Sequence, residues 1–488
     1  MSPVSADGLR ARMRALEPEA RAELTAKLAA RGLLHHLDGG PERAEGEPRA
    51  LSVKQEALWR LHQGGDDGDF HHVGIVYEFA PATTPDHLAT AWARAAAHHE
   101  TLRTSYGPDE DGRVVPRLHP EPPRPELTTA PGAESQDAAS ALRYALGLAR
   151  EDGRRPFALE APPLRVRLVD ARPAALLLAL TAHDLACDRY GLRTVLLPEL
   201  CGLPVRAELR PGDVARWQRE SLSHGLVGEQ LRARREDGGP GSLLAFPGSG
   251  DRAGARIPVR LEAEVSDGLR RLAKASRAGL FAVVLAAWGG VVAAHHGSAE
   301  VAVGCCTSGR HRPELEGVLA NLANTLLVRV PAATDPASAS ASATRQSAEA
   351  EAEAERLELV RRRLVEAMGA ADVPFERLLE ESGGPPPPRR DEEAGVRLTL
   401  DEPQPSAEAA GPGSGLAEGA PRCTGAADVD FGYAKCGLDL QLDATGTELT
   451  GHLAYRPAVV ARETAQELSR TLLRHLTALA GPPAPALR

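Results

Sequence analysis

The chain has 488 residues, of which 42% are hydrophobic and only 3% are aromatic, and its formal net charge at pH 7 is −10. This length fits two or three domains with substantial apolar cores. The negative charge and the scarcity of aromatic side chains disfavour a nucleic-acid partner, because phosphate binding needs a basic surface and single strands need stacking platforms.

The six cysteines form no CxxC pair, so we predict neither a disulfide framework nor a zinc site. We interpret the adjacent Cys305 and Cys306 as small core residues. No apolar run approaches the roughly 18 residues of a membrane span, and the N-terminus lacks the apolar segment of a signal peptide. We therefore expect a cytoplasmic protein without a membrane partner.

The first half begins with charged segments and becomes globular near residue 51. Residues 1–34 predict one or two short helices that either dock onto a partner or form a solvated cap, and residues 35–50 have the composition of a linker. In the helix that follows, we expect Leu58, Trp59 and Leu61 to point inward. Helices are predicted at 51–63, 88–107, 138–151 and from 215 to 223, and strands at 72–79, directly after residue 107 and at 163–170.

An apolar run from Ala174 to Leu180 lies at the centre of the first half and suits a strand buried on both faces. Ionisable side chains follow it, before Leu192, Val195 and Leu196 resume with helical spacing. The exit of a buried strand is where enzymes commonly keep their chemistry. The alternative is a solvated loop between strand and helix. The side chains that follow the run are His183, Asp184, Cys187, Asp188 and Arg189.

The stretch 237–255 is rich in Gly and Pro and is the preferred boundary between two halves. It divides the chain into a lead-in at 1–49, an N-terminal half at 50–240 and a C-terminal half at 241–488. The tract that contains Pro385–Pro388 has a disordered composition. The predicted fold class is α+β. The second half predicts strands near 256–263, 299–307, 322–330, 396–402, 437–444 and 448–457, and helices near 266–276, 280–296, 338–368, 373–381 and 463–480.

Six segments together resemble the condensation domains of nonribosomal peptide synthetases. LSVKQEALWRLHQ resembles the opening motif of that family, HHETLRT its RHExLRT, and ARWQRE its xxWQRE. GCCTSGR resembles the family's strand that ends in GR, LANTLLVR its FVNTLxLR, and ADVPFERLLEE its xDVPFExLxxx. The resemblance covers roughly residues 50–480, and the six motifs occur in the family's order.

The resemblance implies two chloramphenicol-acetyltransferase-like halves that form a V with a central tunnel. Two phosphopantetheine arms of carrier proteins would enter this tunnel from opposite faces, and the protein itself would bind no cofactor. The family's active-site motif, HHxxxDG, corresponds to the segment from His183 to Arg189. His183 and Asp188 match the motif, whereas Asp184 replaces its catalytic His and Arg189 replaces its Gly.

The replacement by Asp184 weakens general-base catalysis, because a carboxylate with a pKa near 3.9 is a poorer base than an imidazole near 6.5. It also places negative charge where an oxyanion forms. Asp184 could still orient a cationic amine, or it could have no role. His183, structural by resemblance, is the one imidazole left in the motif.

The resemblance makes Asp188 a structural residue that pairs with an arginine, for which Arg310 is the candidate. Arg189 is expected to line the tunnel, where it either pairs with Asp184 or binds a substrate acid group; the alternative is that it points to solvent. We expect no metal at His183, Asp184 and Asp188, because a second cluster with ligand spacing is missing.

Two functions from different classes follow from the resemblance. The first is an enzyme that forms an amide or ester between a carrier-bound acyl thioester and an amine or hydroxyl acceptor, which could be a small molecule. The second is a catalytically silent module that recruits a tailoring enzyme or bridges synthetase subunits, because a recruitment branch of the family carries a degenerate motif. Carrier proteins are the expected partners of either.

Overall fold

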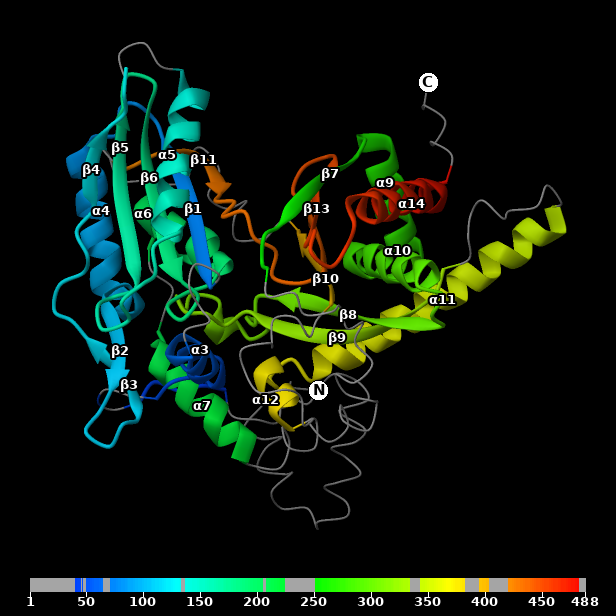
Figure 1. Ribbon diagram of the computed structural model, residues 1–488, viewed down its shortest axis with the longest axis horizontal. Coiled ribbons are helices and arrows are strands. Elements are labelled where there is room, and N and C mark those ends of the chain that lie inside the picture. Colours follow the sequence, from blue (N-terminus) through cyan, green and yellow to red (C-terminus); the bar gives the residue numbers. More distant parts are fainter. Residues whose placement is uncertain are drawn as a thin grey trace, which may run out of the picture.

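The computed structural model describes residues 40–44, 46, 50–64, 71–132, 137–204, 208–223, 251–333, 343–381, 395–402 and 420–481. Two lobes that each combine a sheet with helices lie side by side (Figure 1), which confirms the α+β fold class. Three predictions lie outside the described residues: the helices within 1–34, most of the boundary stretch, and the tract with Pro385–Pro388.

The sheet of the N-terminal lobe is built around β6 (Ala175–His183), which pairs antiparallel with a strand on each side. One face of this sheet packs against α4 (Pro85–His98) and the other against α5 (Ala138–Gly153). Every residue of β6 is buried, which confirms the strand predicted from the apolar run. Across the sheet, the described strands are ordered β11 (Cys423–Asp428), β1 (His72–Phe79), β6, β5 (Leu164–Ala171) and β4 (Glu126–Thr129).

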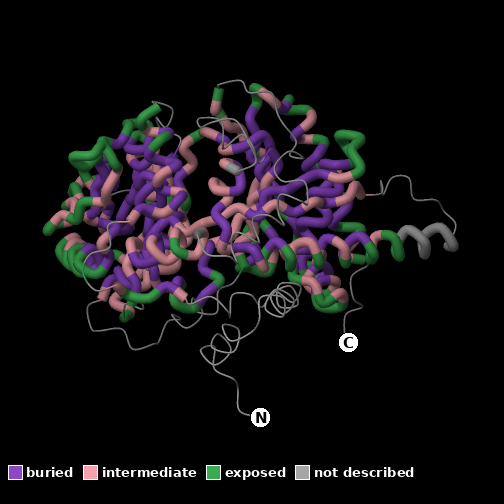
Figure 2. Tube along the Cα trace, turned by 90° about the horizontal axis from the view of Figure 1, so that it is seen from below, coloured by how far each residue is buried: buried purple, intermediate pink, exposed green. Residues whose placement is uncertain are grey.

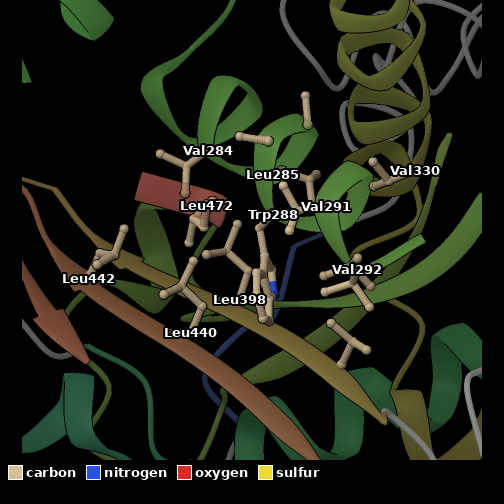
Figure 3. Close-up of a cluster of buried hydrophobic side chains, with 14 of the residues drawn as sticks. Val284, Leu285, Trp288, Val291, Val292, Val330, Leu398, Leu440, Leu442 and Leu472 are labelled. Atoms are coloured by element: carbon tan, nitrogen blue, oxygen red, sulfur yellow. The ribbon is translucent and has the colours of Figure 1, made fainter. Parts of the chain in front are cut away.

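The sheet of the C-terminal lobe is covered by helices on the face that points away from the N-terminal lobe (Figure 1). Trp288, at the centre of this core, is fully buried (Figure 3). The described strands are ordered β7 (Ala255–Leu261), β13 (Leu449–Tyr455), β12 (Leu438–Asp443), β10 (Val396–Asp401), β8 (Glu300–Thr307) and β9 (Asn324–Pro331). The covering helices are α9 (Ala263–Ala275), α10 (Leu280–His295), α11 (Ala343–Gly369) and α14 (Arg462–Ala480).

The pieces that join the two lobes lie at their base (Figure 1). Helix α3 buries Leu58, Trp59 and Leu61 as predicted, and the tube in Figure 2 shows buried segments in the middle of both lobes. These pieces are α3 (Val53–Gln63), α7 (Pro211–Ser223) and α12 (Phe375–Glu381), with the hairpin of β2 (Thr104–Pro108) and β3 (Val114–Leu118) beside them.

The helix predicted over 88–107 is too long, because α4 ends at His98 and β2 already begins at Thr104. His99 is extended, and its Nε2 lies 2.6 Å from a carboxylate oxygen of the buried Glu199. This tertiary contact ends the helix although the sequence pattern continues. Strand β3 matches the strand expected after residue 107, whereas β2, β4 and β11 were not predicted from the sequence.

Strand β11 belongs to the C-terminal half of the chain, yet it pairs antiparallel with β1 in the N-terminal lobe. The predicted division at residue 240 therefore places β11 with the wrong sheet. No single helix in the described ranges is long and apolar enough to cross a membrane; α9 and α10 pass that test only together, and a bend of 106° separates them.

Candidate functional site at the end of β6

The turn that follows β6 is held by the neighbouring strand. His72 of β1 lies opposite His183 of β6, and the backbone N–H of Asp184 donates to the carbonyl oxygen of His71 at 2.7 Å. After Asp188, the chain continues as the π-helical segment Gly191–Leu196 and the short helix α6 (Leu197–Leu200). The predicted strand, polar turn and helix are therefore present in that order.

His183 is buried and stabilises this turn from within. Its Nδ1 accepts a hydrogen bond from the backbone N–H of Leu185 at 3.0 Å. Because a backbone N–H can only donate, the neutral ring carries its proton on Nε2. The rings of His72 and Phe157 lie against it, with centroids 5.7 and 6.2 Å away. This geometry favours positioning of the turn over proton transfer.

Asp184 lies 2.6 Å from the ammonium of Lys435, measured from its Oδ2 to the Lys435 Nζ. The Nδ1 of His71 lies 3.8 Å from the same oxygen. Burial alone would raise the pKa of Asp184, but Lys435 and His71 outweigh burial and hold this pKa well below its usual range. The carboxylate is therefore permanently ionised near neutral pH and is a poor general base.

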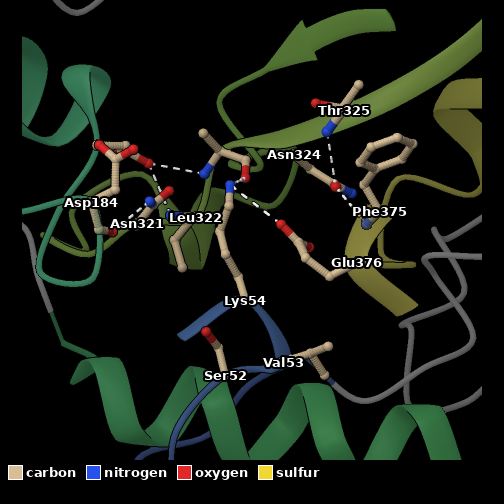
Figure 4. A network of polar contacts seen from close by, with 12 residues as sticks. Ser52, Val53, Lys54, Asp184, Asn321, Leu322, Asn324, Thr325, Phe375 and Glu376 are labelled. Atoms are coloured by element: carbon tan, nitrogen blue, oxygen red, sulfur yellow. Dashed lines mark hydrogen bonds and ion pairs between the residues drawn. The ribbon is translucent and has the colours of Figure 1, made fainter. Parts of the chain in front are cut away.

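The main chain around Asp184 also connects the two lobes. The Asn321 Nδ2 donates to the carbonyl oxygen of Asp184 at 2.6 Å (Figure 4), and Asn321 belongs to the loop that precedes β9. Lys435 lies just before β12. Both partners of Asp184 from the C-terminal half therefore reach across the junction between the lobes.

Asp188 accepts hydrogen bonds from both halves of the chain. Its Oδ2 accepts from the Arg310 Nη1 at 2.8 Å and from the backbone N–H groups of Leu322 and Ala323, each at 2.9 Å. Its Oδ1 accepts from the Gly191 N–H at 2.7 Å. Both side chains of the Asp188–Arg310 pair are nearly inaccessible, at 6% and 0% exposure. The structure thus brings together the two residues that the resemblance pairs.

The guanidinium of Arg310 makes three further hydrogen bonds. It donates to the carbonyl oxygens of Ser308, Val318 and Ala320 at 2.8–2.9 Å. Arg310 therefore organises the loop between β8 and β9, and Asp188 attaches this loop to the N-terminal lobe.

The expected ion pair of Arg189 with Asp184 is not formed, whereas its binding of a substrate acid group stays a prediction. Its guanidinium lies 2.7 Å from Asp401 at the end of β10 and 2.7 Å from Asp428 at the end of β11. Its side chain is 40% exposed. Lys435 occupies the place beside Asp184 instead. Arg189 thus acts as a bridge between the two sheets.

Lys435 and His71 were not predicted from the sequence as site residues. Lys435 lies in a stretch, AKCGLDL, whose lysine has no partner that sequence spacing could identify, because Asp184 is 251 residues away. His71 is the first residue of a His doublet whose second residue, His72, begins β1, and its place beside Asp184 depends on the antiparallel pairing of β1 with β6. The doublet itself was the one available signal.

A cavity of about 860 Å³ lies beside the hairpin β2–β3, and none of the side chains of the site lines it. Its wall includes Gln55 and Tyr106, and both donate to the carbonyl oxygen of Leu185, at 3.1 and 3.3 Å. Burial raises the pKa of Tyr106 well above its usual value, so the phenol remains protonated. Within the described residues, no group of three or more His, Cys, Asp or Glu side chains is placed to hold a metal ion.

Comparison with known sequences identifies relatives of this chain. The family model described as "Condensation domain" matches residues 246–488. The phosphinothricin tripeptide synthetase PhsC of Streptomyces viridochromogenes is 30% identical over 400 residues, which cover 77% of this chain and 35% of the relative. The chain therefore spans about a third of the length of this curated relative.

Solved structures with the same fold include a condensation domain and an X-domain. The first condensation domain of the calcium-dependent antibiotic synthetase, in complex with a substrate analogue, superposes with a TM-score of 0.68 and 18% identity, covering 90% of this chain and 98% of that one. The X-domain of teicoplanin biosynthesis, in complex with OxyB, has a TM-score of 0.67 and 20% identity, covering 91% and 96%.

Proposed function

The chain belongs to the condensation-domain family, and on this premise we propose that it forms an amide or ester bond between a carrier-bound acyl thioester and an amine or hydroxyl acceptor. The acyl group arrives on the phosphopantetheine arm of a carrier protein. The acceptor is either a second carrier-bound group or a free small molecule. The protein itself contributes the site and no cofactor.

The ion pair between Asp184 and Lys435 is the observation that carries this proposal. It stands where the family motif has its catalytic imidazole, and the Asp184 side chain is only 12% exposed. Buried ion pairs contribute little net stability, because removing two charges from water costs about as much as their attraction returns. A charged pair at this position is therefore better explained by binding than by stability.

Lys435 also removes the electrostatic objection to a carboxylate in this site. Its ammonium compensates the charge of Asp184 and supplies N–H donors to an oxygen that becomes negative as the thioester is attacked. In the reaction, the acceptor nitrogen or oxygen bonds to the carbonyl carbon and the C–S bond breaks. The departing thiolate takes up the proton that the acceptor loses, so an amine that arrives unprotonated needs no enzymatic base.

The proposal is tested by reconstitution with the acyl-loaded carrier proteins of the same biosynthetic pathway, with product detected by mass spectrometry. Asp184→Ala and Lys435→Met should each lower turnover at least tenfold, which corresponds to about 1.4 kcal/mol in activation free energy. Lys274→Met, at an exposed position of α9, is the matched control. Full activity of Asp184→Ala would remove the pair from the mechanism.

A second candidate, a silent module that binds a tailoring enzyme, is favoured by one observation. The fold neighbour from teicoplanin biosynthesis is seen in complex with OxyB, and in this chain Asp184 and Arg189 of the motif are both engaged in ion pairs. Absence of product with every loaded carrier, also for Asp184→His, would favour this alternative. Titration calorimetry with the tailoring enzymes of the same pathway would then test it directly.

A further inference from the structure

The face of the C-terminal sheet that bears no helices carries several polar and charged side chains. In β10 and β12, Leu398 and Leu440 point into the helix-covered core. Because successive side chains alternate between faces, the residues between them point the other way. On this opposite face lie Arg397 of β10, Asp439 and Gln441 of β12, and His452 of β13, which we call the sheet-face cluster.

The register of the strands makes the sheet-face cluster contiguous. Arg397 is the parallel partner of Asp439, and Gln441 is the antiparallel partner of His452. Partners across neighbouring strands lie about 5 Å apart. The flanking positions in the register are small, because Gly304 lies beside Arg397 and Ala454 lies beside Asp439. These two neighbours add little side-chain volume beside Arg397 and Asp439.

Three atoms of the sheet-face cluster have no hydrogen-bond partner among the residues that the structure describes. These buried atoms are the Arg397 Nε, the Asp439 Oδ1 and the His452 Nε2. Asp439 is only 3% exposed. An unsatisfied buried polar atom typically costs about 1–3 kcal/mol, so three on one face of one sheet require an explanation.

The other atoms of the same side chains are fixed. The Arg397 Nη2 donates to the Cys306 Sγ at 2.7 Å, and the Gln441 Nε2 donates to the Asp439 Oδ2 at 2.8 Å. Cys305 is a core residue as predicted, whereas Cys306 lies on the opposite face and accepts a hydrogen bond from the Arg397 guanidinium. Both charged groups are thus fixed by one hydrogen bond, while the Arg397 Nε and the Asp439 Oδ1 have no hydrogen-bond partner among the described residues.

The sheet-face cluster lies on the same strands, or beside the same segments, as residues that contact the candidate site. Asp401, on the same face of β10 four residues after Arg397, binds Arg189 of the N-terminal lobe. Lys435, four residues before Asp439, binds Asp184. In Figure 1, the face of this sheet that has no helices is turned to the N-terminal lobe.

We propose that the sheet-face cluster is a substrate subsite that recognises a group with an N–H donor beside an oxygen acceptor, of which a carboxamide is the simplest. The Arg397 Nε–H donates to the oxygen and the Asp439 Oδ1 accepts from the nitrogen. Since both partners are charged, these are the stronger class of hydrogen bonds. The subsite rests on the proposed function in that it takes the ligand to be part of the transferred or accepting group.

The test compares two probes of equal shape by titration calorimetry. These are the asparaginyl and the leucyl amide of N-acetylethylenediamine, which imitate a thioester to a pantetheine arm but resist hydrolysis. We expect the wild-type protein to bind the asparaginyl probe at least tenfold more tightly than the leucyl probe. This preference needs no variant, so it tests the subsite even if substitutions impair folding. Equal binding of the two probes by the wild type overturns the subsite.

Two variants then assign the preference to the cluster. Arg397→Met and Asp439→Asn should each abolish the preference while leucyl binding remains. The controls are Arg260→Met on β7, an exposed arginine of the same sheet, and Asp443→Asn at the exposed end of β12; both should keep it. A preference that survives Arg397→Met and Asp439→Asn contradicts the assignment, because ordered water would then satisfy these atoms.

The outcome is separable from that of the proposed function. Probe discrimination that depends on Arg397 and Asp439, without product from any loaded carrier, supports the subsite and contradicts the transfer reaction. Product that forms equally well from asparaginyl and leucyl substrates supports the transfer reaction and contradicts the subsite.

Discussion

The hydrogen bonds of Asp188 allow a stability prediction with a worked magnitude. Asp188→Ala leaves the buried Arg310 guanidinium without its carboxylate and also strands the N–H groups of Gly191, Leu322 and Ala323. Breaking a buried ion pair from one side typically costs about 3–5 kcal/mol. An unfolding entropy of about 2.1 cal/mol/K per residue gives about 1 kcal/mol/K for this chain, so we expect Tm to fall by about 3–5 °C.

The assay is thermal unfolding measured by differential scanning calorimetry, and two further variants serve for comparison. Arg310→Met should cost less than Asp188→Ala, because Asp188 keeps three backbone donors. Asp267→Ala breaks an exposed pair with Arg270 on α9 and should change stability by no more than about 1 kcal/mol. If Asp188→Ala melts within about 1 °C of the wild type, the carboxylate does not hold the two lobes together as argued.

Two further predictions concern His72 and Arg189. Burial and the nearby His183 lower the pKa of His72 to about 4. Below pH 6.5 the unfolded chain therefore binds more protons than the folded protein, and the free energy of unfolding falls by about 2 kcal/mol between pH 7.5 and pH 5. Urea unfolding midpoints should show this pH dependence in the wild type and in the exposed-site control His87→Asn; a pH dependence that persists in His72→Asn would contradict it. Arg189→Gly should leave turnover within about threefold of the wild-type value, because the exposed ion pairs of Arg189 contribute about 1 kcal/mol or less. A tenfold gain or loss of turnover in the assay with loaded carrier proteins would show that Arg189 governs access to the site.

The sequence predicted those elements whose side chains alternate or repeat regularly. The run Ala174–Leu180 is apolar because β6 is covered on both faces, and α10 is apolar all round because it is buried in the C-terminal core. Local pattern carries this information. The motif resemblance placed Asp188 and Arg310 together, which spacing alone could not do over 122 residues.

The sequence did not predict contacts that depend on how strands pair across the chain. The partnership of Asp184 with Lys435 needs the crossing of β11, and that strand is short and has weak alternation. The interpretation of Cys306 failed for a simpler reason. Adjacent residues in a strand face opposite sides, so Cys305 and Cys306 could not both belong to one core.

The crossing of β11 has a practical consequence for dissecting this protein. A fragment that ends near residue 240 would lack β11 and would expose the unpaired backbone of β1, whose edge β11 covers. Bare sheet edges promote association between copies. The remaining fragment, from about residue 241 onward, would contain β11 without β1, its partner strand. We therefore expect the two fragments to be poorly soluble when expressed apart and to reassemble when expressed together, so the chain is better suited to a split reporter than to separate expression of its halves.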